Sequence, residues 1–442
     1  MRPSREPLHL IEVGLNWPPD TFLRWKLEGL VRRGFRVTVV SHFRYGQPFS
    51  IPGVELLHMP EPTAPLRTSL PNTARDGLPL LISHPRRFAA LLVAIARRSR
   101  RSDAFAGIDS RLSRRRRWRE RIGQLRRLFR LAALRPDVAH FEWESTAVSC
   151  LPIADVWSCP VVISCHGGLQ AYGQMGAYDS IFEGLRAAFE RASAVQCVSR
   201  LERNEAIRHG LASAKARLIP CGVDPTVFSP PSPASRDGDE MRLIAVGWLR
   251  WLKGYEYSVR TIRMLLDAGV PARLDVFGGD PLPPMEEPSD RARILHTISD
   301  LELDDHVRLH GHVPSEILID RLRSAHAFLH SSLSEGLPVV ILEAMACELP
   351  VVATDSGGVR EAVSHGVDGF VLPPRDPAGA AAALERLWRE PELRERMGQA
   401  GRARVLSDFT LESHLEDMER LYAEVTGASG SGSRALSPRG SH

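Results

Sequence analysis

Short apolar runs alternate with amphipathic stretches along most of the chain. In the first half, the apolar runs expected to form buried strands occupy residues 8–14, 35–41, 137–143, 160–167 and 194–199. Between several of them apolar positions recur at helical spacing, as in residues 21–34, where Gly34 suits the end of a helix. Buried strands that alternate with helices are typical of a parallel β-sheet covered by helices, so the pattern predicts an α/β fold.

The same pattern restarts in the second half, after a stretch rich in Pro, Ser and Gly at residues 229–240. The second set of strands is expected at residues 241–248, 272–279, 306–313, 325–332, 349–355 and 369–374. A chain of 442 residues exceeds what one hydrophobic core usually supports. We therefore expect two parallel-sheet domains that face a central cleft, with ligands bound at the carboxyl ends of the strands. The predicted boundaries are a first domain at 1–222, a linker at 223–240, a second domain at 241–405, a C-terminal helix at 406–426 that packs back on the first domain, and a disordered tail at 427–442.

Composition places the chain among ordinary globular proteins, with 43% hydrophobic and 25% charged residues. Its six cysteines contain no CxxC pair, which favours reduced thiols over a disulfide framework or a zinc site. Residues 1–15 lack the apolar stretch of a signal peptide, and no run has the length of a membrane span. We therefore expect a cytoplasmic protein.

The positive charge is concentrated in one segment. Residues 97–130 hold 14 arginines against three acidic residues, although the whole chain carries a net charge of only +4. Within 111–130 the side chains of Trp118, Ile122, Leu125 and Phe129 recur at the spacing of one helical face. Such a basic amphipathic helix suits an anionic membrane surface. Alternatively, the stripe packs on its own domain and the arginines are solvated; nucleic-acid binding is disfavoured because no nucleic-acid motif accompanies the charge.

Two glutamates in an apolar stretch are the strongest candidates for chemistry. Glu335 is expected in the loop after strand 325–332, and Glu343 in the helix that follows Pro338. A buried carboxylate costs several kcal/mol unless something pairs with it. The amides at the start of this helix can bind an anionic group such as a diphosphate, and the carboxylates can accept hydrogen bonds from sugar or ribose hydroxyls. In the alternative interpretation, Glu335 is a solvated loop residue and Glu343 forms a local salt bridge.

The surrounding sequence carries a family resemblance. Residues 330–373 resemble the nucleotide-sugar site of the retaining GT-B glycosyltransferases, which are marked by two glutamates with seven residues between them. The resemblance continues through 218–228, 246–262, 276–282 and 309–318, and the wording of residues 250–260 is most similar to bacterial exopolysaccharide transferases of the colanic-acid type. It implies the GT-B architecture, with two Rossmann-like domains.

The resemblance also implies roles for residues of the second domain. Glu343 would hold the ribose hydroxyls and Glu335 the hydroxyls of the transferred sugar. Lys253 would hold the diphosphate, together with the amides of Gly336 and Leu337.

This chain differs from the family at one position of the phosphate site. Many relatives have an arginine where this chain has Trp248, and Arg250 is the candidate to replace it. Val313, in the turn 311–313, matches the position whose backbone commonly reads the base.

The first domain resembles the family more weakly. Gly14 would approach phosphate or sugar in a loop at 14–22, and Asn16 and Asp20 are candidates for the acceptor side. His166 ends a predicted strand, is followed by two glycines, and matches the histidine of the family beside the reacting carbon. A single histidine more often has a structural role. The assignment of His166 therefore depends on its position at the end of a strand, before two glycines.

No cofactor and no metal site is expected. The one carboxylate cluster that resembles a metal motif, at 237–240, lies in the predicted linker. The resemblance therefore implies a retaining, metal-independent transfer of sugar from a nucleoside diphosphate sugar to a hydroxyl acceptor, such as a lipid-linked or polysaccharide intermediate. The alternatives are a nucleotide-sugar-binding protein without activity and a GT-B epimerase. A phosphorylase is disfavoured because the chain has only three lysines, and Lys253 already matches the phosphate role.

Overall fold

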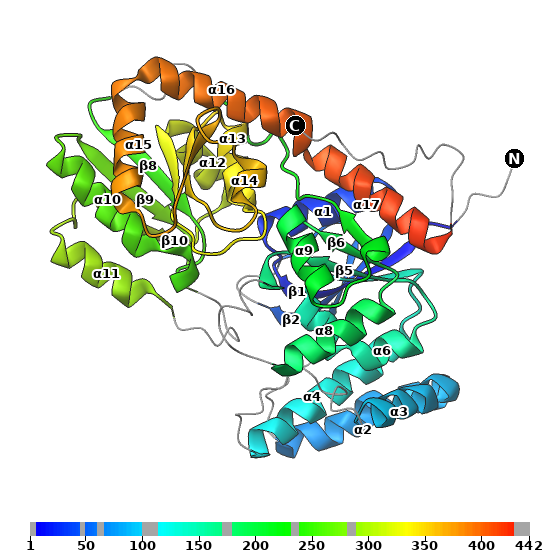
Figure 1. Ribbon diagram of the computed structural model, residues 1–442. Coiled ribbons are helices and arrows are strands. Elements are labelled where there is room, and N and C mark those ends of the chain that lie inside the picture. The colour runs from blue at the N-terminus through cyan, green and yellow to red at the C-terminus, as the bar shows by residue number, and fades with distance from the viewer. Residues whose placement is uncertain are drawn as a thin grey trace, which may run out of the picture. The chain divides into compact units, whose positions relative to one another are not determined.

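The chain folds into two compact units, each of them an α/β structure (Figure 1). The computed structural model describes residues 6–44, 49–59, 66–99, 114–169, 179–230, 238–280 and 289–427. Unit 1 comprises Met1–Val198, Arg203–Ile219 and Leu415–His442, and unit 2 comprises Ser199–Glu202 and Pro220–His414. The prediction of two parallel-sheet, Rossmann-like domains is confirmed.

The described part of unit 1 is built on a seven-stranded parallel sheet in the order β3-β2-β1-β4-β5-β6-β7. All the strands predicted from apolar runs are present. Two further strands were not predicted: β3, which is more exposed, and β7, which has only three residues. The strands are β1 (His9–Trp17), β2 (Arg36–Arg44), β3 (Val54–His58), β4 (Val138–Phe141), β5 (Val161–Cys165), β6 (Ala194–Cys197) and β7 (Ala216–Leu218).

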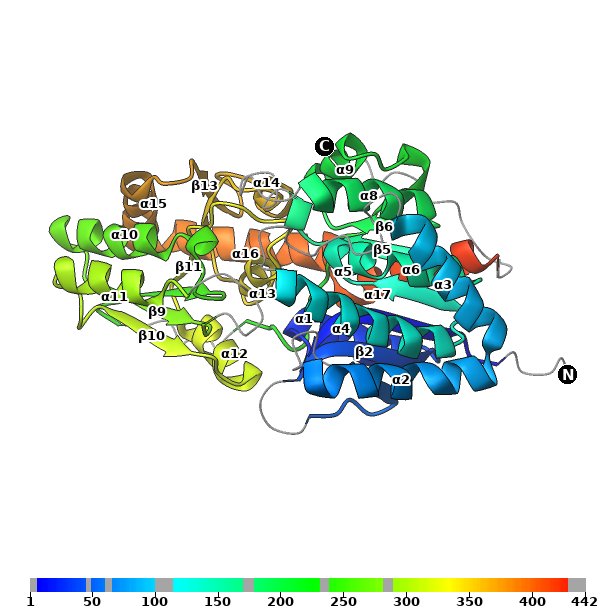
Figure 2. The same ribbon diagram turned by 90° about the horizontal axis from the view of Figure 1, so that it is seen from below.

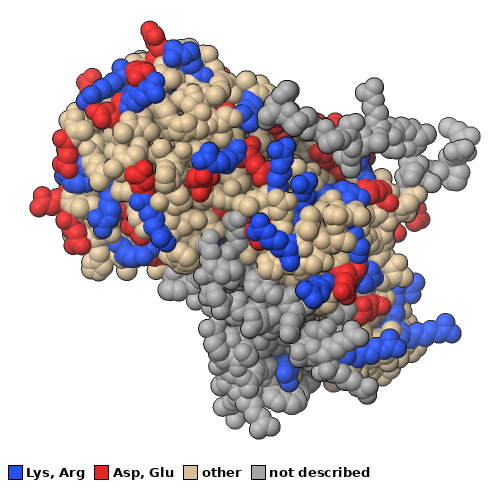
Figure 3. Space-filling view, viewed as in Figure 1, with Lys and Arg blue, Asp and Glu red and all other residues tan. Residues whose placement is uncertain are grey.

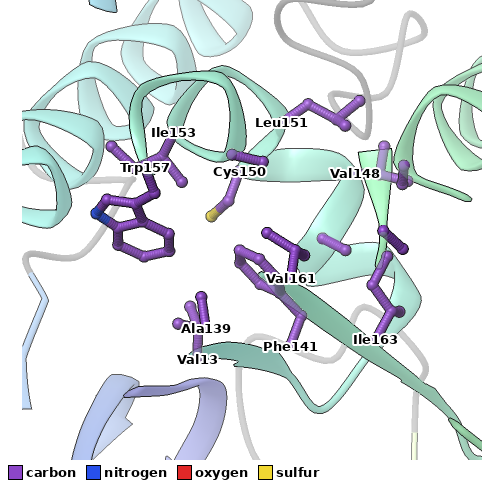
Figure 4. Close-up of a cluster of buried hydrophobic side chains, with 14 of the residues drawn as sticks. Val13, Ala139, Phe141, Val148, Cys150, Leu151, Ile153, Trp157, Val161 and Ile163 are labelled. Carbon is purple, nitrogen blue, oxygen red and sulfur yellow. The ribbon is translucent and has the colours of Figure 1, made fainter. Parts of the chain in front are cut away.

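The central strands of unit 1 are buried because helices cover them. Every residue of β4 and β5 is buried, and their apolar side chains join one hydrophobic cluster with the short helices that follow β4 (Figure 4). Trp157 is 2% exposed in this cluster and donates its indole N–H to the carbonyl of Leu131 at 3.1 Å. The helices of unit 1 are α1 (Thr21–Arg32), α2 (Leu66–Ser83), α3 (Pro85–Ser99), α4 (Arg114–Ala133), α5 (Glu144–Ser149), α6 (Leu151–Val156), α8 (Asp179–Arg191) and most of α9 (Arg200–Arg208), with a 3-10 turn at Ser213–Lys215.

Gly34 ends the first helix as the sequence predicts. It follows the cap residue Arg33 and has a φ of +87°, a conformation that side chains other than glycine rarely adopt.

The predicted loop at 14–22 is wrong in its first half. Strand β1 continues to Trp17 because β2 continues beside it to Arg44, with a register irregularity around Gly14. The position requires glycine for a structural reason: its φ is +99°, and a Cβ there would lie 2.6 Å from Oγ1 of Thr146 in α5. Gly14 therefore allows α5 to pack closely on β1.

The apolar stripe of the basic segment faces inward in its described part. Ile122 and Phe129 of α4 are buried, and the ring of Phe129 stacks on Phe88 of α3 with centroids 5.5 Å apart. The arginines of α4 also have protein partners, since Arg126 and Arg130 both bind the carboxylate of Asp76, in α2, at 2.8 and 3.0 Å. Figures 1 and 2 show α2, α3 and α4 packed together at one end of unit 1.

The expectation that this stripe faces lipid is thus wrong for its buried members. The stripe forms the interface that α4 makes with α2 and α3. Residues 100–113, and the side chains of Arg114–Arg117 and Trp118, lie outside the described residues. None of the described helices combines the length and the apolarity needed to cross a bilayer.

The described part of unit 2 contains a six-stranded parallel sheet in the order β10-β9-β8-β11-β12-β13. All six strands were predicted, each two to four residues longer than observed. They are β8 (Met241–Val246), β9 (Ala272–Phe277), β10 (Val307–Gly311), β11 (Ala327–His330), β12 (Val351–Thr354) and β13 (Gly369–Leu372). The helices are α10 (Tyr255–Asp267), α11 (Arg291–Asp300), α12 (Ser315–Ser324), α13 (Val339–Ala346), α14 (Val359–Ala362), α15 (Pro377–Arg389), α16 (Pro391–Asp408) and α17 (Leu411–Thr426), with a 3-10 turn at Trp251–Lys253.

The start of the predicted linker is part of unit 2. Val223 exchanges backbone hydrogen bonds with Phe409 and Leu411, and a Cβ on Gly222 would lie 2.3 Å from the carbonyl oxygen of Thr410. Residues 231–237 of the predicted linker and 428–442 of the predicted tail lie outside the described residues.

Most of α17 belongs to unit 1, from Leu415 onward. Leu415 packs against Gly29 of α1, where a Cβ would lie 2.3 Å from a Leu415 methyl group. Arg33 and Glu419 form an ion pair at 2.8 Å, and Tyr422 is fully buried in unit 1. The last helix therefore places the hydroxyl group of Tyr422 in the interior of unit 1.

Candidate active site

The residues of unit 2 that are candidates for binding the nucleotide sugar lie after two adjacent strands. Lys253 lies in the segment after β8, and Glu335 lies in the loop after β11. Strands β8 and β11 are neighbours in the sheet, and the strand order reverses between them. Ligands of open parallel sheets bind at such a reversal, outside the carboxyl ends of the strands.

Lys253 and Glu335 form a partly buried ion pair. The Lys253 ammonium lies 2.6 Å from Oε1 of Glu335, which also accepts a hydrogen bond from the Ser332 hydroxyl at 2.5 Å. Nε2 of His330 lies 3.1 Å from the same oxygen. Burial would raise the pKa of Glu335, but the Lys253 ammonium and the His330 ring outweigh it and hold that pKa well below its usual range. The sequence brings Lys253 and Glu335 to one site, as the family pattern implies, and adds His330 and Ser332 to it.

The loop that carries Glu335 rests on two glycines. Gly357 has a φ of +62°, and a Cβ there would lie 1.6 Å from the carbonyl oxygen of Glu335. A Cβ on Gly358 would lie 2.0 Å from the carbonyl oxygen of Gly336. The loop after β12 therefore holds the backbone of Glu335–Gly336 in place, directly before Leu337 and the N-terminus of α13, whose cap residue is Pro338.

Glu343 has a different environment, although it lies only eight positions along the chain. It is 6% exposed in α13, and no side chain among the described residues donates a hydrogen bond to its carboxylate. Burial alone raises the pKa of Glu343 to about 8. The carboxyl group is thus largely protonated at neutral pH, and hydroxyl donors from a bound ribose would favour its ionised form.

The loops after β8, β9 and β10 come together beside this site. A Cβ on Gly279 would lie 3.9 Å from the Trp248 ring and 3.8 Å from His312. Val313 is half-buried in the same turn as His312, where base recognition is expected. Arg250 is half-buried, and its carbonyl accepts from the amide of Lys253 at 2.9 Å, so both cations belong to one short turn.

In unit 1 the predicted residues follow β1 and β5. Asn16 is exposed near the end of β1, and Asp20 is half-buried at the N-terminus of α1. His166 directly follows β5, and its side chain is 7% exposed. Its ring lies between two aromatic side chains, with centroids 5.1 Å from Trp143 and 5.5 Å from Phe22.

His166 is held by a carboxylate that the sequence analysis did not single out. Nε2 of His166 lies 3.0 Å from Oε2 of Glu142, which follows β4. The other oxygen of Glu142 accepts a hydrogen bond from the Lys26 ammonium. Burial would raise the pKa of Glu142, but Lys26, His140 and His166 lower it well below its usual range, so the carboxylate is ionised.

The same lysine lies at the centre of a buried polar network. The Lys26 ammonium is 3.0 Å from Glu12 Oε1 and 3.1 Å from Nδ1 of His140. The Tyr422 hydroxyl lies 2.8 Å from that nitrogen. Glu12, His140 and Glu142 form the one group of potential metal ligands found among the described residues, and the Lys26 ammonium already occupies the space between them.

A further buried carboxylate lies close by. Glu144, in the first turn of α5, is 1% exposed, and neither of its carboxylate oxygens has a hydrogen-bond partner among the described residues. Burial raises the pKa of Glu144 to about 7, although the nearby His166 opposes this shift.

The signal for these missed residues was present in the sequence. Glu12 and Glu142 interrupt apolar runs that otherwise read as buried strands, and Lys26 lies on the apolar face of the first helix. A charge at a core position indicates a buried partner.

Two glycosyltransferase families match parts of the chain. Residues 232–404 match the family described as "Glycosyl transferases group 1", and residues 86–227 match the family described as "Glycosyltransferase Family 4".

Two curated relatives illustrate the similarity. The chain is 31% identical over 288 residues to a D-inositol 3-phosphate glycosyltransferase of Frankia alni, covering 60% of this chain and 70% of the relative. It is 30% identical over 220 residues to the amylovoran biosynthesis glycosyltransferase AmsK of Erwinia amylovora, covering 48% of this chain and 51% of the relative. The chain thus spans 51% to 70% of the length of these curated relatives.

Solved structures show the same fold. The sucrose-phosphate synthase of Thermosynechococcus elongatus has a TM-score of 0.70 at 19% identity, covering 96% of this chain and all of the other. The Anabaena protein HepE, in complex with UDP and glucose, has a TM-score of 0.67 at 16% identity, covering 94% and 99%.

We expect the two glutamates of unit 2 to affect stability in opposite directions at about pH 9. The pKa of Glu335 is lowered on folding, so its charge stabilises the native state above its unfolded pKa of about 4.3, and Glu335→Gln loses that contribution. The raised pKa of Glu343 means that its contribution is present below about pH 4.3 and lost as the pH rises through about 8. Glu343→Gln avoids that loss and should raise the melting temperature at pH 9.

Thermal unfolding of both variants at about pH 5 and pH 9 measures this difference. The gain of Glu343→Gln should grow with pH. Shifts of the same sign in both variants at pH 9 would contradict the assignment of one ionised and one protonated carboxyl group.

Glu142→Gln should destabilise unit 1 strongly, because it leaves the buried Lys26 ammonium with one carboxylate instead of two. Breaking a buried pair costs about 3–5 kcal/mol. The control is Asp267→Asn, which removes an exposed ion pair with Arg263 and should cost less than about 1 kcal/mol. Urea unfolding measures both, and equal midpoints for the two variants would show that the network around Lys26 does not hold the fold together.

Proposed function

The chain belongs to the group 1 glycosyltransferase family, and from this premise we propose that it is a retaining, metal-independent enzyme that transfers a sugar from a nucleoside diphosphate sugar to a hydroxyl acceptor. The observation that carries the proposal is the cluster of Lys253, Glu335 and His330 at the strand reversal of unit 2, directly before the N-terminus of α13. A cation next to a helix N-terminus favours a diphosphate, and an ionised carboxylate beside it favours sugar hydroxyls.

Each proposed contact has a reason in the geometry. Lys253 and the amides of Gly336 and Leu337 bind the diphosphate, and Glu335 accepts hydrogen bonds from the transferred sugar. Arg250, in the same turn as Lys253, supplies the second cation that relatives provide at the position of Trp248. Glu343 accepts the ribose hydroxyls, which gives its buried carboxylate the donors that the described side chains do not provide.

The reaction needs charge stabilisation more than a covalent nucleophile. The bond between the anomeric carbon and the diphosphate oxygen breaks, and the acceptor oxygen bonds to that carbon on the same face. The proton of the acceptor passes to the departing diphosphate oxygen. Lys253 and the start of α13 stabilise the negative charge on the leaving group, a role that a metal ion has in other transferases. His166, held by Glu142, steadies the sugar beside the reacting carbon.

The relatives suggest which substrates to test first. The Anabaena protein is described with UDP and glucose, so UDP-glucose is the first donor. AmsK is named for amylovoran biosynthesis, which supports a polysaccharide or lipid-linked intermediate as the acceptor. Asn16 and Asp20 are the proposed acceptor-side residues.

Two other functions share this site. A non-catalytic nucleotide-sugar-binding protein would bind the donor without breaking the bond to the diphosphate. A GT-B epimerase would change the sugar and release no transferred product. The slow hydrolysis of donor that a transferase performs when water takes the place of the acceptor distinguishes both from the proposed enzyme.

We expect slow release of UDP from UDP-glucose, with a rate that EDTA leaves unchanged. Lys253→Ala should lower the rate about 100-fold or more, the effect of removing one electrostatic contact to the leaving group. Lys215→Ala is the matched control, because its ammonium binds the backbone carbonyls of Phe189 and Glu190 in unit 1.

The result depends on donor identity, so the assay is run with a panel of nucleotide sugars chosen by thermal shift, since a bound donor stabilises the native state. Activity that returns only with added magnesium or manganese would overturn the metal-independent mechanism. A donor that binds and is never cleaved would favour the non-catalytic alternative.

A further inference from the structure

Exposed apolar side chains gather on one pair of helices. Eleven large hydrophobic side chains are exposed in the described part of the chain, and five of them lie within 16 residues of α2 and α3. They form what we name the α2–α3 face: Leu78, Leu81, Ile82, Leu92 and Val93, which are 55%, 43%, 71%, 44% and 47% exposed. The other six are scattered over residues 207–406.

The spacing of these residues puts them on the outer faces of their helices. In α2, Leu78, Leu81 and Ile82 follow the i, i+3, i+4 pattern of one helical face. In α3, Leu92 and Val93 continue a face that begins with the exposed Ala89. The inner faces are occupied, because Leu80 and Leu91 are buried in the core of unit 1. Both helices are thus apolar on the side that packs and on the side that does not.

The charge around this face has one sign among the described side chains of 72–97. Arg75, Arg86 and Arg97 are exposed there. The one acidic residue, Asp76, is turned inward to Arg126 and Arg130. Figure 3 shows blue Lys and Arg side chains at the lower right, toward the end of unit 1 where Figure 1 draws α2 and α3.

We propose that the α2–α3 face docks unit 1 on an anionic lipid bilayer. Apolar side chains flanked by arginines fit the boundary between acyl chains and negatively charged headgroups. A second copy of the chain fits less well, since a two-fold interface would bring the two sets of arginines together, and the described side chains of 72–97 offer no exposed acidic partner. The buried stripe of α4 packs against α2 and α3. The basic segment therefore contributes by holding these two helices in position.

This surface is independent of the sugar-transfer chemistry, and it rests on the proposed function only for its purpose, which is to bring the enzyme to a lipid-linked acceptor. The two proposals can therefore fail separately.

Sedimentation with liposomes tests the docking surface in the full chain. Vesicles of phosphatidylcholine alone are compared with vesicles of equal parts phosphatidylcholine and phosphatidylglycerol, at low and high salt. We expect binding to the anionic vesicles that weakens as salt rises. The double variant Ile82→Gln, Leu92→Gln should weaken that binding about tenfold or more, because it removes two side chains that enter the interface.

The matched control is Leu295→Gln, Ile317→Gln, which changes two side chains of 48% and 47% exposure in unit 2 and should bind as the wild type does. Circular dichroism and thermal unfolding should match the wild type in both double variants, which shows that they are folded whether or not the chain cleaves UDP-glucose. Equal liposome binding by the two double variants would overturn the proposal. So would a wild-type protein that ignores anionic vesicles, or one that light scattering shows to be a dimer separated by Ile82→Gln, Leu92→Gln.

Discussion

Ionised carboxylates buried at the carboxyl ends of parallel strands are the constraint on which both candidate sites depend. Such a charge is stable only where a cation and hydrogen-bond donors reach it. The chain has three lysines, and two of them pair with glutamates: Lys26 with the buried Glu142 in unit 1, and Lys253 with the partly buried Glu335 in unit 2. Elsewhere arginine supplies the positive charge. The compact ammonium group fits between several acceptors at once, which the wide guanidinium cannot do as closely.

The two pairs have different consequences. In unit 1, Lys26 joins β1, α1 and β4, and Tyr422 adds the last helix to the same network, so the pair stabilises the fold and holds His166 in one orientation. In unit 2 the pair lies in loops beside a helix N-terminus. There a bound phosphate would compete with Glu335 for Lys253, and a bound sugar would compete with Lys253 for Glu335. Glu343 and Glu144 are the exceptions, since burial raises their pKa values to about 8 and about 7. Of the two, the carboxyl group of Glu343 is the one for which a ligand is proposed.

The sequence predicted those features that depend on local pattern. Apolar runs located the buried strands, and Gly34 marked the end of the first helix. Local pattern did not reveal β3, whose residues are only partly buried, or the continuation of β1 past Gly14, which depends on its pairing with β2. The periodicity of 111–130 correctly indicated a helix with one apolar face, but periodicity does not say whether that face meets lipid or Phe88. Similarly, local pattern shows Glu142 only as a charge near the end of a strand. It does not reveal the partner Lys26, because Lys26 lies 116 residues away along the chain.

We infer that Glu343 is protonated in the free protein and becomes ionised when the ribose of the proposed donor binds to it. Calorimetric titration with the donor at about pH 7, in two buffers of different ionisation enthalpy, measures the protons released on binding. With a pKa of about 8, binding should release about one proton, and Glu343→Gln should abolish the release. The same observed enthalpy in both buffers, or an unchanged release in the variant, would contradict the account.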